Sequence, residues 1–295
     1  MAFTSANFPA EMISEVFTGA KAHSSIAKLC GQTPIAFSGT DVMTFSFDGE
    51  VNLVGEGAAK AAHTNGKDIV TMTPRKIEYG ARVSDEFLRC SDEKKIQHLK
   101  AFNDGFAKKI ARGIDIMAFH GVNPKTGVLA TSLIGENSFD TNDDVTSVTY
   151  NASTLEANLA SAVAAIGDYE NTGMAFSKTF ASGLASIKEN GVSQYPEFKL
   201  GANPGVLGGI PCDVNSTVSY VDGEYAYVGD FANAFKWGYA DMINFEVIEY
   251  GNPDNSEAGD LKGHNQVYLR AEAWIGWGIL DGKAFARIET ASSGS

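Results

Sequence analysis

The chain has 295 residues, of which 44% are hydrophobic, and carries a formal net charge of −13. This length and apolar content fit a globular protein with one large domain or two joined domains. The acidic balance argues against a protein that holds nucleic acid by neutralising phosphates, because that mode needs clustered lysine and arginine. Any contact with DNA is therefore expected to be indirect.

The sequence gives no sign of secretion or of a membrane span. The first nine residues lack a basic segment followed by an apolar run, and no stretch approaches roughly 18 consecutive apolar residues. The cysteines, Cys30, Cys90 and Cys212, are widely spaced and odd in number, so they predict neither a disulfide framework nor a zinc site. A reducing cytoplasm is the expected place of synthesis.

In the first third of the chain, the spacing of apolar residues changes from a helical period to strict alternation. Residues 9–30 place apolar side chains at helical spacing, which predicts a short helix and an arm. Alternation at 43–47 and again at 77–83 predicts two strands. These strands are expected to flank Gly55–Lys67, a tip rich in glycine and alanine that has almost no anchoring bulk.

One very long helix follows a turn at Val83–Glu86. It is predicted to begin near Ser91-Asp92, where either residue can act as N-cap, and to stop at His120-Gly121. A helix of about 28 residues is on the order of 40 Å long, more than twice the usual length. Its core face is expected to consist of Ile96, Leu99, Phe102, Phe106, Ile110, Ile114 and Met117.

The second half mixes helices and strands. After the acidic stretch 136–144, Ser153–Glu156 reads as a capping box that opens a helix with Leu155, Leu159, Val163 and Ile166 on one face. A short strand at Met174–Phe176 and a helix to about Asn190, with Gly191 as its C-cap, come next. After a glycine-rich loop at 201–209, further strands are predicted at 225–228, 245–250, 267–277 and 284–288. Segregated helices and strands indicate an α+β fold.

Patterns of catalytic, cofactor or metal-binding residues are not found. The five histidines lack metal-ligand spacing, and the glycines at 55–57 and 205–209 lack the context of a phosphate loop. Cys90 has no neighbouring histidine to act as a base, and each carboxylate is expected to be solvated. Trp274, Trp277 and Phe285 are interpreted as one core cluster, with an aromatic contact surface as the weaker option.

The order of motifs resembles the major capsid proteins of tailed phages of the Hong Kong 97 type. In the first half the resemblance rests on Gly55-Glu56-Gly57, Lys60, Ile69–Met72, Arg75-Lys76-Ile77, Val83–Leu88, Phe119-x-Gly121, Pro124 and Gly127. In the second half it rests on Leu207–Pro211, Gly229-Asp230-Phe231, Arg270 and Lys283–Ile288. It spans nearly the entire chain and makes no residue catalytic.

The resemblance implies a role for each segment. Residues 1–30 would be the N-terminal arm, 31–83 the extended β-hairpin loop, 84–150 the peripheral domain with its spine helix, 151–250 the axial domain, and 251–295 the return strands of the peripheral domain. Subunits of this family meet as pentamers and hexamers, and the extended loop lies on a neighbouring subunit. Three residues in the loop are therefore expected to contact another subunit: Glu56, Lys60 and Lys67.

The resemblance also implies a setting and partners. The protein would be a structural component of the virion, assembled in the bacterial host cytoplasm around double-stranded DNA that it encloses without reading its sequence. A separate scaffolding protein, a portal and a decoration protein are expected, with no cofactor and no membrane. An encapsulin-like compartment that encloses an enzyme cargo is the first alternative, and a cytoplasmic hydrolase is the second.

Overall fold

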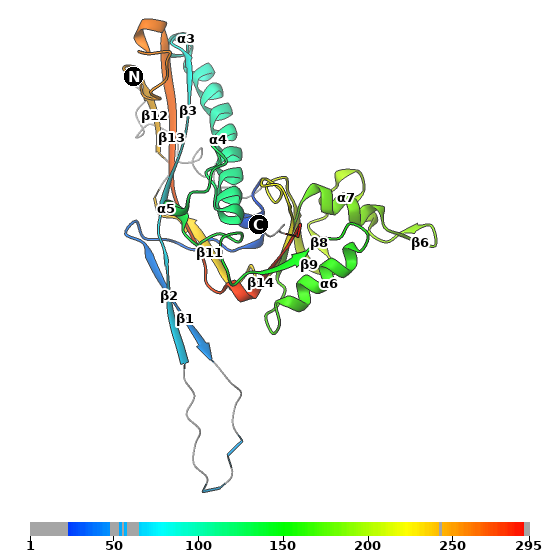
Figure 1. Ribbon diagram of the computed structural model, residues 1–295. Coiled ribbons are helices and arrows are strands. Elements are labelled where there is room, and N and C mark those ends of the chain that lie inside the picture. The colour runs from blue at the N-terminus through cyan, green and yellow to red at the C-terminus, as the bar shows by residue number, and fades with distance from the viewer. Residues whose placement is uncertain (1–22, 48–52, 55, 58–64, 242–243, 292–295) are drawn as a thin grey trace.

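The computed structural model describes residues 23–47, 53–54, 56–57, 65–241 and 244–291. It has three parts (Figure 1). The first, which we call the slab, is a long helix lying on a four-stranded sheet; the second, the lobe, is a six-stranded sheet with two helices beside it. The third is a two-stranded hairpin that projects away from both. This is the α+β organisation expected from the sequence.

The elements alternate irregularly along the chain. The helices are α2 (Ser25–Leu29), α3 (Glu86–Arg89), α4 (Asp92–His120), α5 (Thr131–Ile134), α6 (Leu155–Ala165) and α7 (Lys178–Ser186). The strands are β1 (Thr40–Phe47), β2 (Asn65–Met72), β3 (Arg75–Ser84), β4 (Thr146–Thr149), β5 (Gly173–Phe176), β6 (Lys188–Glu189), β7 (Val192–Ser193), β8 (Val206–Leu207), β9 (Ile210–Val214), β10 (Glu224–Gly229), β11 (Phe235–Tyr239), β12 (Asn244–Ile248), β13 (Gln266–Ile279) and β14 (Phe285–Glu289).

The projecting hairpin consists of β1 and β2, which pair antiparallel from Thr40 opposite Met72 to Phe47 opposite Asn65. The sequence interpretation, in which the strand at 77–83 closes the tip, is wrong on this point. That strand is β3, and it pairs with β13 inside the slab. The alternation at 77–83 is real, but periodicity cannot identify the partner of a strand.

The slab is built around β13, which pairs with β3 along one edge and with β11 and β12 along the other. Helix α4 begins after Ser91 and ends at His120, followed by Gly121, whose φ of 65° is a left-handed C-cap, so both predicted limits are confirmed. The Ser91 side chain makes no cap hydrogen bond, contrary to the predicted capping. Leu99 packs against Val267 and Leu269 of β13. Ile96 is 51% exposed, contrary to the prediction, because the first turns lie outside this cluster.

The sheet of the lobe has the order β4-β14-β10-β5-β9-β8. Helix α6 starts at Leu155, but its N-cap Thr154 makes no side-chain cap bond, so the capping box predicted at Ser153 does not form. The buried line of α6 runs through Leu155, Asn158 and Ala162, and Val163 is 39% exposed. Of the predicted face, Leu155 and Ile166 are buried and Leu159 packs partly buried against the same core, so the prediction is wrong only at Val163.

Helix α7 ends at Ser186, four residues before the predicted end near Asn190. The chain there forms a β6–β7 hairpin, in which Asn190 and Gly191 have φ values of 50° and 81°. Two consecutive positive φ angles are those of the tight turn that asparagine followed by glycine favours. Gly191 therefore closes a hairpin and does not cap a helix.

The aromatic cluster divides between the core and the surface. Trp277 and Phe285 belong to the main core, whereas Trp274 is only half-buried and packs edge-on against the exposed Phe37 at a centroid distance of 4.8 Å. The two tryptophans differ in burial because positions 274 and 277 of one strand face opposite sides of the sheet.

Candidate assembly surfaces and the buried junction

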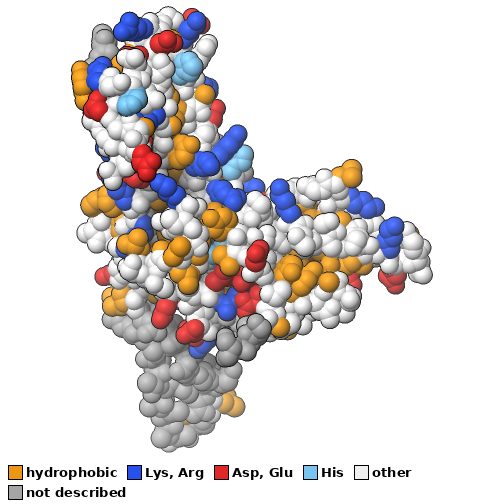
Figure 2. Space-filling view, turned by 45° about the horizontal axis from the view of Figure 1, so that its top comes forward, with side chains coloured by type: hydrophobic (Ala, Val, Ile, Leu, Met, Phe, Trp, Pro, Cys, Tyr) orange, Lys and Arg blue, Asp and Glu red, His pale blue; other side chains and the backbone are white. Residues whose placement is uncertain are grey.

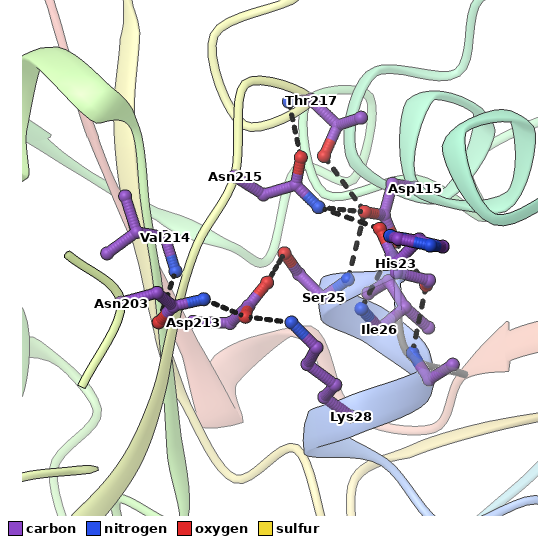
Figure 3. A network of polar contacts seen from close by, with 12 residues as sticks. His23, Ser25, Ile26, Lys28, Asp115, Asn203, Asp213, Val214, Asn215 and Thr217 are labelled. Atoms are coloured by element: carbon purple, nitrogen blue, oxygen red, sulfur yellow. Dashed lines mark hydrogen bonds and ion pairs between the residues drawn. The ribbon is translucent and has the colours of Figure 1, made fainter. Parts of the chain in front are cut away.

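A buried carboxylate joins the N-terminal segment to the long helix. Asp115 of α4 is fully buried and accepts a hydrogen bond of 2.5 Å from the Ser24 hydroxyl. It also accepts bonds from the backbone N–H groups of Ser25, at 2.9 Å, and Ile26, at 3.1 Å (Figure 3). The first N–H groups of a helix have no partner within that helix, so Asp115 completes the start of α2.

The same carboxylate is also tied to the segment that follows β9. Asn215 donates from its amide at 3.1 Å, and Thr217 donates from its hydroxyl at 2.9 Å. Burial raises the pKa of Asp115 to about 6, although the hydrogen bonds from Ser24, Ser25, Ile26 and Thr217 act in the opposite direction. Desolvation is therefore the larger effect, and Asp115 gains a proton in mildly acidic solution.

A second carboxylate lies beside the first. Asp213 of β9 is buried and accepts hydrogen bonds from Ser25 (2.6 Å) and Asn203 (2.7 Å) (Figure 3). It also forms an ion pair with Lys28 at 2.5 Å. Together the two aspartates fix α2 between α4 of the slab and β9 of the lobe, so this junction sets how the two parts meet.

His120, at the end of α4, extends the junction. Its Nδ1 lies 2.6 Å from Asp140, and its Nε2 lies 2.8 Å from the carbonyl oxygen of Thr217. The Tyr227 hydroxyl donates to the other oxygen of Asp140 at 2.6 Å. Burial raises the pKa of Tyr227 well above its usual value, so its proton stays in place as a donor. This network connects the helix end to β10 of the lobe.

A pair of glutamates lies across two inner strands of the lobe sheet. Glu224 of β10 lies directly opposite Glu289 of β14. Burial, followed by the charges of Asp140 and Glu289, raises the pKa of Glu224 to about 9. Glu224 is therefore neutral near pH 7, which avoids two adjacent negative charges.

The far end of the slab is held by one arginine. Arg82 of β3 binds both carboxylate oxygens of Asp254, at 2.9 and 2.6 Å, and also donates to Asn252 and to the carbonyl of Gly259. The guanidinium of Arg82 holds the pKa of Asp254 well below its usual value. The loop between β12 and β13 is thereby folded onto β3.

Two of the three loop residues expected to contact another subunit lie in the described part of the hairpin segment. Glu56 is exposed in a turn, and Lys67 belongs to β2, where its backbone is opposite Phe45. Lys60 lies outside the described residues. The structure therefore places Glu56 and Lys67 on the projecting element without bringing them into one described site.

Sequence reasoning missed two groups of exposed apolar side chains. Met43 and Ile69 are opposite each other on β1 and β2, and each is 55% exposed. Val128, Leu129 and Leu133, beyond the end of α4, are between 56% and 64% exposed. Clustered apolar side chains in water indicate a surface that another molecule covers.

The buried carboxylates were also missed, because each was expected to be solvated. Asp115, Asp213, Glu224 and Asp230 are all buried. For Asp115 a signal was present: it interrupts the apolar run from Ile114 to Phe119 on a helix. A charged residue on a buried stretch requires hydrogen-bond partners, and here they come from segments distant in sequence.

No ligand site competes with these surfaces among the described residues. A hollow lined by Thr73, Arg75, Ile134, Asn137 and Trp277 has a volume of about 10 Å³, far below the roughly 300–1,000 Å³ of typical ligand pockets. In the described part of the chain, no group of three or more His, Cys, Asp or Glu side chains could hold a metal ion. Nor does any described helix have the length and apolar character needed to cross a membrane.

Comparisons with known proteins agree with a shell-forming role. A solved structure from Mycobacterium phage Ogopogo is 28% identical, with a TM-score of 0.76 and coverage of 91% of this chain and 92% of that one. A structure from Gordonia phage Cozz is 23% identical with a TM-score of 0.72, covering 92% and 87%. The capsid of a native GTA particle is 17% identical with a TM-score of 0.62, covering 93% and 91%. No curated protein matched.

The sequence matches the Phage capsid family over residues 7–290, which is nearly its full length. The fold is that of Hong Kong 97-type subunits, as the sequence resemblance predicted. A structural role in a multi-subunit shell follows from this match and agrees with the exposed apolar surfaces. The chain therefore belongs to the Phage capsid family and has the function of a major capsid protein of the virion.

Proposed function

We propose that copies of this chain assemble through pentamers and hexamers into an icosahedral head that encloses double-stranded DNA. The observation that carries this proposal is the β1–β2 hairpin, which projects from the body with Met43 and Ile69 exposed on facing strands (Figure 1). An isolated two-stranded hairpin is only marginally stable in water. A neighbouring subunit beneath it would supply the missing apolar contact, and head-to-tail contacts of this kind close into rings.

Each segment then has a part in the shell. Residues 1–30 act as the N-terminal arm, and of the expected extended loop 31–83 the hairpin at 40–72 is the projecting part, since β3 belongs to the slab. The slab acts as the peripheral domain with its spine helix, and the lobe acts as the axial domain. The expected limits 84–150, 151–250 and 251–295 are therefore corrected at β11 and β12, which return to the slab, and at β14, which belongs to the lobe. The junction at Asp115 and Asp213 supports this division, because it ties the arm to the spine helix and to the axial domain at one point.

The tip of the extended loop makes polar contacts with the neighbour. Glu56, Lys60 and Lys67 lie in the segment between and along the hairpin strands, where the chain has few apolar anchors. The long side chains of lysine and glutamate suit an outer rim of an interface, where charged groups fix register more than affinity.

Assembly takes place in the bacterial host cytoplasm with other proteins. A separate scaffolding protein directs shell size, a portal occupies one vertex, and a decoration protein binds the outside. Family resemblance supports these partners, and the encapsulated duplex is held by enclosure without reading of its sequence.

Negative-stain electron microscopy with size-exclusion chromatography tests the proposal. The full-length protein is expressed alone and together with the neighbouring genes of its genome. Closed shells, tubes or five- and six-membered rings are expected. A monodisperse monomer under every condition would contradict the proposal, and shells that contain a protein cargo in place of DNA would identify a nanocompartment.

A further inference from the structure

The slab has two outward faces, one made by a helix and one by a sheet. Helix α4 packs against one side of the sheet through Leu99 on β13 and through Phe106 edge-on against Phe245 of β12. Where the slab lies flat in a shell one subunit thick, one of these two faces lines the interior. The charge on each face shows which one suits enclosed DNA.

On the sheet face, three cations of β3 and β13 are neutralised within the subunit. Lys76 of β3 pairs with Glu272 of β13 at 2.7 Å, and Arg270 of β13 pairs with Glu246 of β12 at 2.7 Å. Arg82 is held by Asp254, as described above. A polyanion would find no uncompensated positive charge in these three pairs.

The helix face is different. Six of the 23 lysines and arginines of the chain lie on α4, against 4 of its 36 acidic residues, and one of those acids is the buried Asp115. Lys94, Lys108 and Lys109 are exposed and have no carboxylate partner among the described residues. Figure 2 shows Lys and Arg side chains gathered around the middle of the view, below the upper part of the molecule.

The three lysines form one line along the helix. At 3.6 residues per turn, Lys94, Lys108 and Lys109 project within about 100° of one another, and Lys94 lies about 21 Å along the axis from Lys108. Ala101 and Gly105 occupy the same line between them. A side chain added at Gly105 would meet no atom of this chain within 4 Å, so the centre of the line is open.

We infer that the outward face of α4 lines the shell interior and binds the sugar-phosphate backbone of the enclosed duplex DNA. The inference rests on the proposed function, because it takes its ligand from the enclosed genome. Duplex DNA carries one negative charge per roughly 1.7 Å of its axis, so a line of lysines about 21 Å long meets several phosphates without reading sequence. This local contact departs from the expectation, drawn from the net charge of −13, that contact with DNA is indirect. The remaining acidic surface keeps the contact weak, so the genome is held loosely.

Fluorescence anisotropy with a labelled duplex of about 20 base pairs tests the inference on the unassembled full-length protein. Three phosphate contacts give a slope of log affinity against log salt of about −2.7, or about a 40-fold loss between 50 and 200 mM salt. In the combined variant Lys94→Gln, Lys108→Gln and Lys109→Gln this salt-dependent binding is expected to disappear. Glutamine keeps the helix propensity of lysine, so the helix itself is preserved.

A matched control removes three exposed lysines from the lobe: Lys178→Gln, Lys188→Gln and Lys199→Gln. It changes the net charge equally, so retention of the wild-type affinity and slope is expected. Equal weakening in both variants, or no duplex binding by the wild type, would overturn the inference. In a parallel titration, polyglutamate is expected to bind more weakly than the DNA duplex. Tighter binding of polyglutamate would overturn the inference and indicate that the face binds an acidic protein.

Electron microscopy of the same variants separates this inference from the proposed function. If the lysine variant forms normal shells and binds the duplex as tightly as the wild type, the inference is contradicted and the proposed function still stands. A wild-type protein that forms no shells with its neighbouring genes would remove the proposed function itself.

Discussion

At the scale of single residues, the chain concentrates its polar groups where separate segments meet. Asp115, Asp213 and His120 each connect elements that are far apart in sequence. Buried hydrogen-bonded groups of this kind leave little freedom in how the segments pack, because each unmatched donor or acceptor costs about 1–3 kcal/mol. The junction is therefore expected to respond strongly to small chemical changes.

Asp115→Asn tests the junction directly. The amide has one acceptor oxygen in place of two and leaves a backbone N–H of α2 unpaired, so near pH 7 a loss of about 1–3 kcal/mol in the free energy of unfolding is expected. Urea unfolding of the unassembled protein, followed by tryptophan fluorescence, measures it.

The same variant has a signature in pH. The folded-state pKa of Asp115 is raised to about 6, so its stabilisation is fully present below about pH 4 and is lost as the pH rises through about 6. As the pH rises across this window, the free energy of unfolding of the wild type should therefore fall by up to about 3 kcal/mol relative to that of Asp115→Asn. A difference between the two proteins that stays constant with pH would show that Asp115 keeps an ordinary pKa.

At the scale of elements, close backbone approaches decide which segments can lie side by side. Gly238 of β11 is next to the segment that leads from α2, where Gln32 bridges to Trp237. A Cβ added at Gly238 would lie 1.8 Å from the carbonyl oxygen of Thr33. Only glycine fits there, so this position fixes the course of the N-terminal segment across the sheet.

Two glycine-to-alanine changes are expected to have opposite effects. Gly238→Ala should lower the free energy of unfolding by about 1–3 kcal/mol or more, because the obstructing atom belongs to a backbone that must shift. Gly105→Ala, in the open middle of α4, should raise it by about 1 kcal/mol through helix propensity. Thermal unfolding of both variants beside the wild type checks the signs. A Gly238→Ala protein as stable as the wild type would mean that the segment at Thr33 is not held at this distance.

Many elements could be predicted because local rules fixed them. Helix α4 has a long apolar period, a capping residue before it and a glycine after it, and both predicted ends were confirmed. The ends of shorter elements were wrong where two local signals competed. Near Asn190-Gly191, the sequence allows either a helix C-cap or a hairpin turn, and pairing of β6 with β7 decided for the hairpin.

At the scale of the whole molecule, assembly depends on surfaces that are incomplete in one subunit. The hairpin is the clearest case, because an apolar pair on its described strands is left partly exposed in the single subunit. Met43 and Ile69 are both about half exposed. Burying the exposed half of each side chain contributes about 1 kcal/mol, which helps to orient the loop on a neighbour.

Met43→Asp combined with Ile69→Asp should block shell formation and leave subunit folding intact. The added charges would have to be desolvated at the interface, whereas in the free subunit they stay in water. Electron microscopy counts shells, and thermal unfolding of the subunit provides the folding control. The matched variant Met43→Leu with Ile69→Leu keeps the apolar surface and should assemble. Normal shells from the aspartate variant would show that this pair faces solvent in the head.

The sequence by itself determined the α+β class, the long helix and, through the order of its motifs, the capsid family. These follow from local periodicity, capping and turn chemistry, which are encoded within short windows. The tertiary structure decided that β1 pairs with β2, that Asp115 is buried and that Met43 is exposed. Each of these outcomes depends on contacts between distant segments, and periodicity identifies a face of an element without identifying what will cover it.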